Sequence, residues 1–337
     1  MKERYLLLDN ARALLMIHIV CVIHVMYFMH LGSEWARSIL LFEMPCIFFV
    51  AGASQSLHSH QKSFWEMVWN RAKRLLLPYY AFLVVLVLLL LLSSAVGMPL
   101  ADISSFTATD IIKMLLTGGT NKIPYYGYTW FISIYFIISC SLPLQSWIQE
   151  HINKYVYIVI LMAMVTAASF ITLPTGNLEC KNLLVYNLFY MAGFMFYHKM
   201  PHRLLYCCAT VLTAITVTGF ASGIMMPMQD HKFPADYWFM IFGMAWICLF
   251  SLVLKHCRQR KWMLLNLWNR KGYNIYLYQV ISYLIVTAIT DKWIHAVTSE
   301  LGQFTIYAIL LFAINTIFAY IWTKSNLIIT EMETKLI

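Results

Sequence analysis

Four ionisable side chains lie in the first apolar stretch of the chain: Asp9, Arg12, His18 and His24. A charged group placed in hydrocarbon costs several kcal/mol unless it faces protein or water, so such residues are first interpreted as functional. An imidazole can take up and return a proton near neutral pH, and a guanidinium can bind phosphate through two parallel hydrogen bonds. The simpler alternative is that Asp9 and Arg12 lie at the membrane surface and that both histidines hydrogen-bond neighbouring helices.

A second buried charge is expected at Glu43, close to Pro45 in the next apolar run. Proline removes a backbone hydrogen bond and tends to kink a membrane helix, which can open a cavity beside it. Glu43 can act there as a general base, or it can pair with a polar neighbour for structural reasons. Arg71 and Arg74 follow, and membrane topology alone also places basic residues just inside a span.

The elements that must position these groups are membrane helices. Hydrophobic residues make up 61% of the chain, charged residues make up 12%, and the mean hydropathy is +0.68. Soluble domains have roughly 45–50% hydrophobic residues and about 25% charged residues. Runs of about 17–25 apolar residues can each cross ~30 Å of hydrocarbon as a helix, and irregular backbone is excluded from lipid. We therefore predict an all-α, polytopic membrane helical bundle with about ten transmembrane helices, forming a single domain over residues 1–337.

The positions of lysine and arginine predict the orientation of the bundle. The expected spans are roughly 8–31, 38–57, 75–96, 129–147, 154–173, 183–199, 203–226, 236–255, 273–290 and 301–323. With the N-terminus in the cytoplasm, 18 of the 24 basic residues fall on the cytoplasmic side. Positive charge gathers on that side of membrane proteins, so we expect a multi-pass protein of the cell inner (plasma) membrane with both termini cytoplasmic.

Composition also limits the partners. The net charge of +9 is explained by a basic cytoplasmic rim against anionic lipid in the bilayer, and no nucleic-acid partner is expected. The eight cysteines show neither a disulfide framework nor metal-ligand spacing, so we expect no metal. The sequence has no phosphate-binding glycine loop and no G-x-S-x-G turn.

Several short motifs follow one another along most of the chain. Leu8-Asp9-Asn10-Ala11-Arg12 is followed by His24, then by Met44 to Gly52, and then by Arg71 to Pro78. Thr129-Trp130-Phe131-Ile132 is the next match, and weaker ones are Tyr190-Met191-Ala192-Gly193, Lys232-Phe233-Pro234 and Ile275-Tyr276-Leu277. In this order they resemble the acyltransferase 3 family, multispan membrane enzymes that O-acylate bacterial polysaccharides and related acceptors.

The resemblance implies transfer of an acyl group, often acetyl, from cytoplasmic acyl-CoA to a hydroxyl of a glycan or lipid-linked sugar. The donor is then expected to be acetyl-CoA. The catalytic candidates are His24, Glu43 and Asp9, with His24 or Glu43 as the base and Asp9 holding Arg12 in place. His24 can alternatively carry the acyl group itself.

Coenzyme A is polyanionic, and the residues expected to bind it are Arg12, Arg71 and Arg74. The competing class is a transporter or flippase that moves a lipid-linked sugar without chemistry, since buried charges and kinked helices suit it too. The two halves of the chain, however, show no matching pair of broken helices.

This chain departs from the family pattern in ways that bear on the site. The family places ten residues between its arginine and histidine, whereas eleven lie between Arg12 and His24. In a straight helix, a separation of twelve positions leaves two side chains about 120° apart, while eleven returns to within about 20°. Either a π-bulge between them restores the alignment, or another residue takes the role of the histidine, and we predict the bulge. Glu43, Tyr128 and Gln279 stand where many relatives have histidine, so three imidazoles become a carboxylate, a phenol and an amide.

Overall fold

The computed structural model describes residues 5–57, 64–97, 100–116, 122–171, 180–197, 199–257 and 260–335, with side chains up to residue 324. Within these ranges the chain forms helices and no strand. Of the basic residues used to predict orientation, Lys2, Arg4, Lys62, Arg258 and the side chain of Lys335 lie outside the described part.

Eight helices in the described residues are long and apolar enough to cross a membrane. They are Leu6–Phe28, Glu34–Ser56, Phe64–Ala95, Phe131–His151, His202–Ala221, Tyr237–His256, Met263–Thr290 and Glu300–Lys324. The polytopic helical bundle is therefore confirmed, but the expected count of ten is not. The other two expected spans coincide with α8 (Lys154–Ser169) and α9 (Cys180–Phe196), and both helices are shorter than any of these eight.

The chain divides into two compact units, residues 1–43 with 258–337 (unit 1) and residues 44–257 (unit 2). The prediction of a single domain stays a prediction, and each unit is described by itself.

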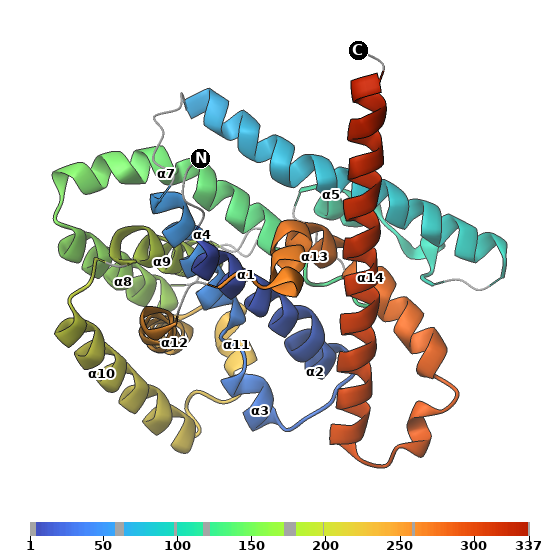
Figure 1. The fold of residues 1–337 in the computed structure, drawn as a ribbon. Coiled ribbons are helices and arrows are strands. Elements are labelled where there is room, and N and C mark those ends of the chain that lie inside the picture. Colours follow the sequence, from blue (N-terminus) through green and yellow to red (C-terminus); the bar gives the residue numbers. More distant parts are fainter. Residues whose placement is uncertain are drawn as a thin grey trace. The chain divides into compact units, whose positions relative to one another are not determined.

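Unit 1 is built from the first and last spans (Figure 1). The first span comprises α1 (Leu6–His18), a π-helical turn η1 (Ile19–Ile23) and α2 (His24–Phe28). It packs against α13 (Met263–Thr290), which packs against α14 (Glu300–Lys335). The short helices α3 (Glu34–Ile39) and η3 (Ile294–Ala296) belong to the connections of this unit.

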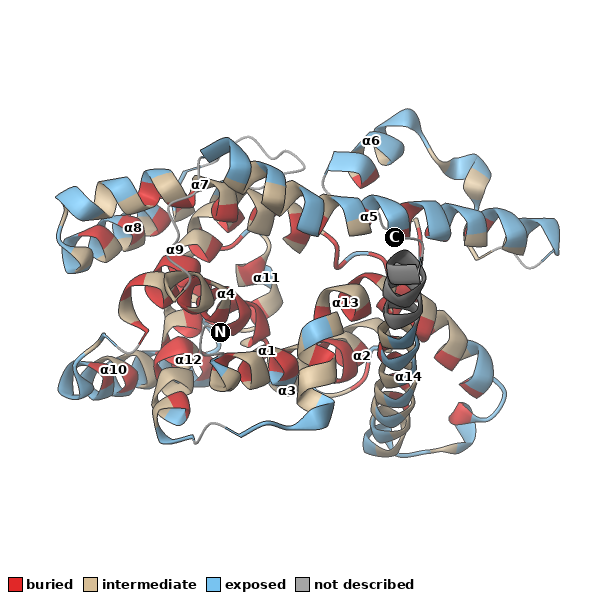
Figure 2. Ribbon diagram, turned by 45° about the horizontal axis from the view of Figure 1, so that its top comes forward, coloured by how far each residue is buried: buried red, intermediate tan, exposed pale blue. Residues whose placement is uncertain are grey.

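Unit 2 contains the remaining helices. They are α4 (Glu43–Ser56, whose first residue belongs to unit 1), α5 (Phe64–Ala95), η2 (Ile103–Ser105), α6 (Ala108–Leu116), α7 (Phe131–His151), α8, α9, α10 (His202–Ala221), α11 (Met228–Lys232) and α12 (Tyr237–His256). The pairs that pack together include α5 with α7, α8 with α9, and α10 with α12. Figure 2 shows α9 largely buried, while α5 and α10 expose long stretches of their surface. Between Leu77 and Leu92 the exposed residues on α5 are mostly leucine and valine, which suits a surface in contact with lipid.

Two glycines from the motifs allow α4 and α9 to pack closely within unit 2. A Cβ atom added at Gly52 would lie 1.9 Å from the Tyr190 carbonyl oxygen, and one added at Gly193 would lie 1.9 Å from the Phe49 carbonyl oxygen. Both distances are far shorter than any real contact, so only glycine fits at either position. Small residues often allow membrane helices to approach in this way. Packing thus explains the glycine of each motif.

Candidate active site in the first span and α13

His24 is held by a side chain from the opposite end of the sequence. Its Nδ1 atom lies 2.7 Å from Oε1 of Gln279, on α13. Gln279 is completely buried, and its Nε2 donates to the carbonyl oxygen of Tyr276 at 2.9 Å. The His24 ring also stacks on Phe28, with the ring centroids 5.0 Å apart. His24 is therefore oriented by an amide whose own orientation is fixed.

The hydrogen-bond pattern determines which nitrogen of His24 carries the proton. Because the amide nitrogen of Gln279 donates to the Tyr276 carbonyl, its oxygen is the atom that faces His24. An amide oxygen only accepts, so Nδ1 of His24 must be the donor. In the neutral imidazole, Nε2 then carries the lone pair. This tautomer can accept a proton at Nε2, as a general base requires.

The predicted π-bulge is present. The residues Ile19–Ile23 form a π-helical turn, and the His24 amide donates to the Ile19 carbonyl across it. The hydroxyl of Tyr283, on α13, donates to the Val20 carbonyl oxygen within the bulge at 2.8 Å. Because a bulge absorbs one residue, twelve positions behave as eleven, and Arg12 and His24 both face α13.

Arg12 lies at the N-terminal end of the same face. Its Nη1 atom is 3.2 Å from Oδ1 of Asn269 and 3.7 Å from Oδ1 of Asp9. The Arg12 side chain is 34% exposed, so it is held in place while part of it stays accessible. With the bulge counted, Arg12 and His24 are separated by about 17 Å along the helix axis. Asp9 and Arg12 thus lie together near the N-terminal end of the first span, whereas His24 lies near its other end.

The two remaining ionisable groups in this part of unit 1 have different surroundings. Glu43 is 2% exposed, and its carboxyl group lies near enough to the Tyr276 hydroxyl to interact with it electrostatically. His18 has its Nε2 atom 2.9 Å from the Leu40 carbonyl oxygen, and its ring stacks on Phe42. The environment of His18 therefore agrees with the structural interpretation, in which it connects neighbouring segments.

The two arginines proposed for coenzyme binding lie on α5, in unit 2. Arg71 is half-buried and donates a hydrogen bond from Nη2 to Oε1 of Gln55, on α4. Arg74 is exposed. Because the two units are described separately, the roles of both arginines stay predictions.

Sequence reasoning missed the importance of α13. Asn269, Tyr276, Gln279 and Tyr283 recur at separations of seven, three and four, which puts them on one helix face. A polar stripe with that spacing in an apolar span is the sequence pattern that could have identified α13 as part of the site. Its members face the first span through the contacts of Asn269 with Arg12, Gln279 with His24 and Tyr283 with Val20.

Among the described residues, no three histidine, cysteine, aspartate or glutamate side chains gather as a metal-binding group. The comparisons with known proteins give one match. The model of an acyltransferase domain, that of the acyltransferase 3 family, matches residues 5–321, nearly the whole chain. No curated protein and no solved structure matches this sequence.

Proposed function

The chain belongs to the acyltransferase 3 family and is a membrane acyltransferase, and on this premise we propose that it moves an acetyl group from acetyl-CoA to a hydroxyl of a glycan or lipid-linked sugar. It does so in the plasma membrane, with both termini in the cytoplasm. The observation that carries the proposal is the hydrogen bond between His24 Nδ1 and the Gln279 amide oxygen, since it favours the tautomer in which Nε2 can accept a proton.

The chemical step needs one base. His24 Nε2 takes the proton of the acceptor hydroxyl while the hydroxyl oxygen attacks the carbonyl carbon of the thioester. An ester bond forms, the carbon–sulfur bond breaks, and the coenzyme A thiolate leaves. The proton on Nε2 then passes to that thiolate, which returns the imidazole to its starting state.

The separation of Arg12 from His24 suits a long, extended donor. Acyl-CoA carries its phosphates and its thioester at opposite ends of the pantetheine arm. Phosphates bound by Arg12 place the thioester further along the span, toward His24, about 17 Å away. Asp9 and Asn269 keep the guanidinium in place. Arg71 and Arg74, in unit 2, stay candidates for coenzyme binding on the basis of the resemblance alone.

Glu43 is the second candidate for the base. It is buried and interacts electrostatically with the hydroxyl of Tyr276, which lies on the same helix as Gln279, so a proton acceptor there also lies within unit 1. Substitution by glutamine keeps its shape and removes its charge. Comparison of Glu43→Gln with His24→Gln therefore tells which group takes the proton.

The proposal is tested with membrane vesicles that contain the chain and are supplied with acetyl-CoA labelled in its acetyl group. We expect the label to appear on glycan or lipid-linked sugar as an alkali-labile O-ester, and only in vesicles that contain the chain. Label on another class of acceptor would overturn the glycan assignment. Movement of a lipid-linked sugar across the vesicle membrane with no label on it would favour the transporter class.

A further inference from the structure

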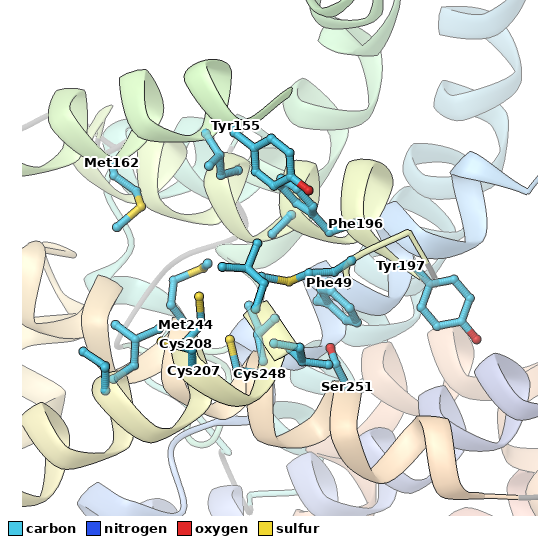
Figure 3. A pocket seen from close by; sticks show the side chains of 18 of the residues that line it. Phe49, Tyr155, Met162, Phe196, Tyr197, Cys207, Cys208, Met244, Cys248 and Ser251 are labelled. Atoms are coloured by element: carbon cyan, nitrogen blue, oxygen red, sulfur yellow. The ribbon is translucent and has the colours of Figure 1, made fainter. Parts of the chain in front are cut away.

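Unit 2 encloses an apolar cavity of about 430 Å³ between α8, α9, α10 and α12. Figure 3 shows the side chains that line it, including Met162 of α8, Cys208 of α10, and Met244 and Cys248 of α12. Pockets that hold small ligands are commonly about 300–1,000 Å³. With walls of hydrocarbon and sulfur, this cavity suits an apolar ligand.

The cavity opens toward the outer surface of these helices. Val159 of α8 and Val211 of α10 line the cavity and are 60% and 52% exposed, respectively. In a membrane-spanning bundle, exposed aliphatic side chains of this kind are in contact with lipid. A hydrocarbon chain can therefore enter from the bilayer without crossing water.

One end of the cavity is basic. Lys255 lines it, and its Nζ atom donates to the Met200 carbonyl oxygen at 3.1 Å. The Nζ atom of Lys154 lies 5.2 Å from the ring centroid of Tyr155, which also lines the cavity. The four helices that form the walls contain no aspartate or glutamate. No carboxylate on these four helices therefore neutralises the ammonium groups of Lys154 and Lys255. Basic sites of this kind at the ends of membrane helices attract anionic head groups.

We propose that this cavity binds one hydrocarbon chain of an anionic phospholipid, whose phosphate lies at Lys154 and Lys255. The inference does not depend on the proposed function, because none of the candidate catalytic or coenzyme-binding residues lines the cavity. A chain in this position supplies the packing that an empty apolar cavity lacks. The lipid composition of the membrane then affects the stability of unit 2.

Photo-crosslinking tests the proposal on the purified full-length protein in neutral detergent. The probe is phosphatidylglycerol with a diazirine in one hydrocarbon chain, and mass spectrometry locates the crosslinked residues. We expect crosslinks on cavity-lining residues such as Met162, Cys208 and Met244. Unlabelled phosphatidylglycerol should compete better than phosphatidylcholine with the same chains.

Two variants and a matched control make the test specific. Lys154→Gln and Lys255→Gln should each weaken competition by phosphatidylglycerol about fivefold and leave phosphatidylcholine unaffected. Lys324→Gln is the control, because the Lys324 ammonium also lies 5.2 Å from a tyrosine ring centroid but belongs to α14. Crosslinks outside the cavity, equal competition by the two lipids, or an equal effect of Lys324→Gln would overturn the proposal. Full competition by glycerol phosphate alone, which has no hydrocarbon chain, would also overturn it.

Discussion

The Nδ1 atom of His24 donates to Oε1 of Gln279 over 2.7 Å, and this bond joins the first span to α13 across 255 positions of sequence. The partner is an amide, at a position where the resemblance led us to expect histidine. An amide cannot share the acid–base role of an imidazole, but it can orient one. His24 is thereby held in the tautomer that a base needs.

Gln279→Leu removes the group that orients His24. Loss of one hydrogen bond of about 1 kcal/mol corresponds to a fall in kcat of about fivefold, with little change in KM for acetyl-CoA. The rate of labelled acetyl transfer at saturating donor measures this. Gln279→His, which restores a donor or acceptor on the same face, should keep more activity than Gln279→Leu. Wild-type kcat in the leucine variant would contradict the orienting role.

Tyr283→Phe removes the hydroxyl that donates to the Val20 carbonyl in the π-bulge. Because Tyr283 is completely buried, the carbonyl loses a partner that water cannot replace, at a cost of about 1–3 kcal/mol. Thermal unfolding in detergent measures the loss. Tyr80→Phe is the control, since it removes the same kind of bond, from a tyrosine hydroxyl to the Leu115 carbonyl oxygen at 3.2 Å, but far from the bulge in sequence. Equal losses in the two variants would count against a special role for the bulge contact.

Arg12→Lys keeps the positive charge but loses the bidentate geometry for phosphate. We expect KM for acetyl-CoA to rise about tenfold, with a smaller effect on kcat. Asp9→Asn should raise KM by about fivefold at most, because the ion pair is long and Arg12 is 34% exposed. Initial rates at varied donor concentration measure both effects. A fall in kcat alone in Arg12→Lys would remove Arg12 from the coenzyme site.

Gly193→Ala tests the close packing of α4 and α9. The added methyl would overlap the Phe49 carbonyl oxygen, so one helix must shift, at a cost of about 3 kcal/mol or more. The yield of monodisperse protein and its thermal midpoint should both fall. Gly127→Ala provides the comparison, because a Cβ atom there meets nothing within 4 Å. A Gly193→Ala protein as stable as the Gly127→Ala protein would show that the helices can separate freely.

His231 lies outside the membrane spans and makes stability depend on pH. Its Nδ1 lies 2.6 Å from Oδ2 of Asp236, and its Nε2 lies 3.0 Å from the Ile224 carbonyl oxygen. The hydrogen bond to Asp236, more than any other contact, raises the pKa of His231 above its ordinary 6.5. Since the folded pKa is the higher one, the stabilisation is complete below about pH 6.5 and is lost as pH rises through the raised pKa.

His231→Gln should abolish that dependence. The thermal midpoint of the wild type, minus that of the variant, is expected to be largest in acid and to shrink as pH rises. A difference that stays constant with pH, or that grows with it, would contradict the sign of the pKa shift. Asp236 also caps α12 by accepting from the Trp238 and Phe239 amides, so it is a poor choice for this test.

The sequence was enough to predict the features that depend on local spacing. The π-bulge was predicted because the family that the chain resembles has one residue fewer between the arginine and the histidine, and helix geometry converts that difference into an angle. Spans long enough to cross the bilayer follow from composition in the same way. The interpretation of His18 as a structural residue agrees with its contact to the Leu40 carbonyl.

Features that depend on tertiary packing could not be predicted. Asn269 and Gln279 lie more than 250 positions from their partners, and no local pattern specifies which helix packs against the first span. The expected span at 183–199 has the same length as α9 (Cys180–Phe196), but α9 is not among the eight helices long and apolar enough to cross a membrane. Its 17 residues are largely buried among the other helices of unit 2, so its apolar character reflects protein packing as well as lipid.

The most direct measurement is the rate of labelled acetyl transfer in vesicles that contain His24→Gln, beside vesicles with His18→Gln and Glu43→Gln at matched protein levels. Loss of a general base predicts a fall of about 10²–10⁴-fold in His24→Gln, while His18→Gln stays near wild type. A His24→Gln protein that transfers acetyl at the wild-type rate, with the loss found in Glu43→Gln, would contradict His24 as the base.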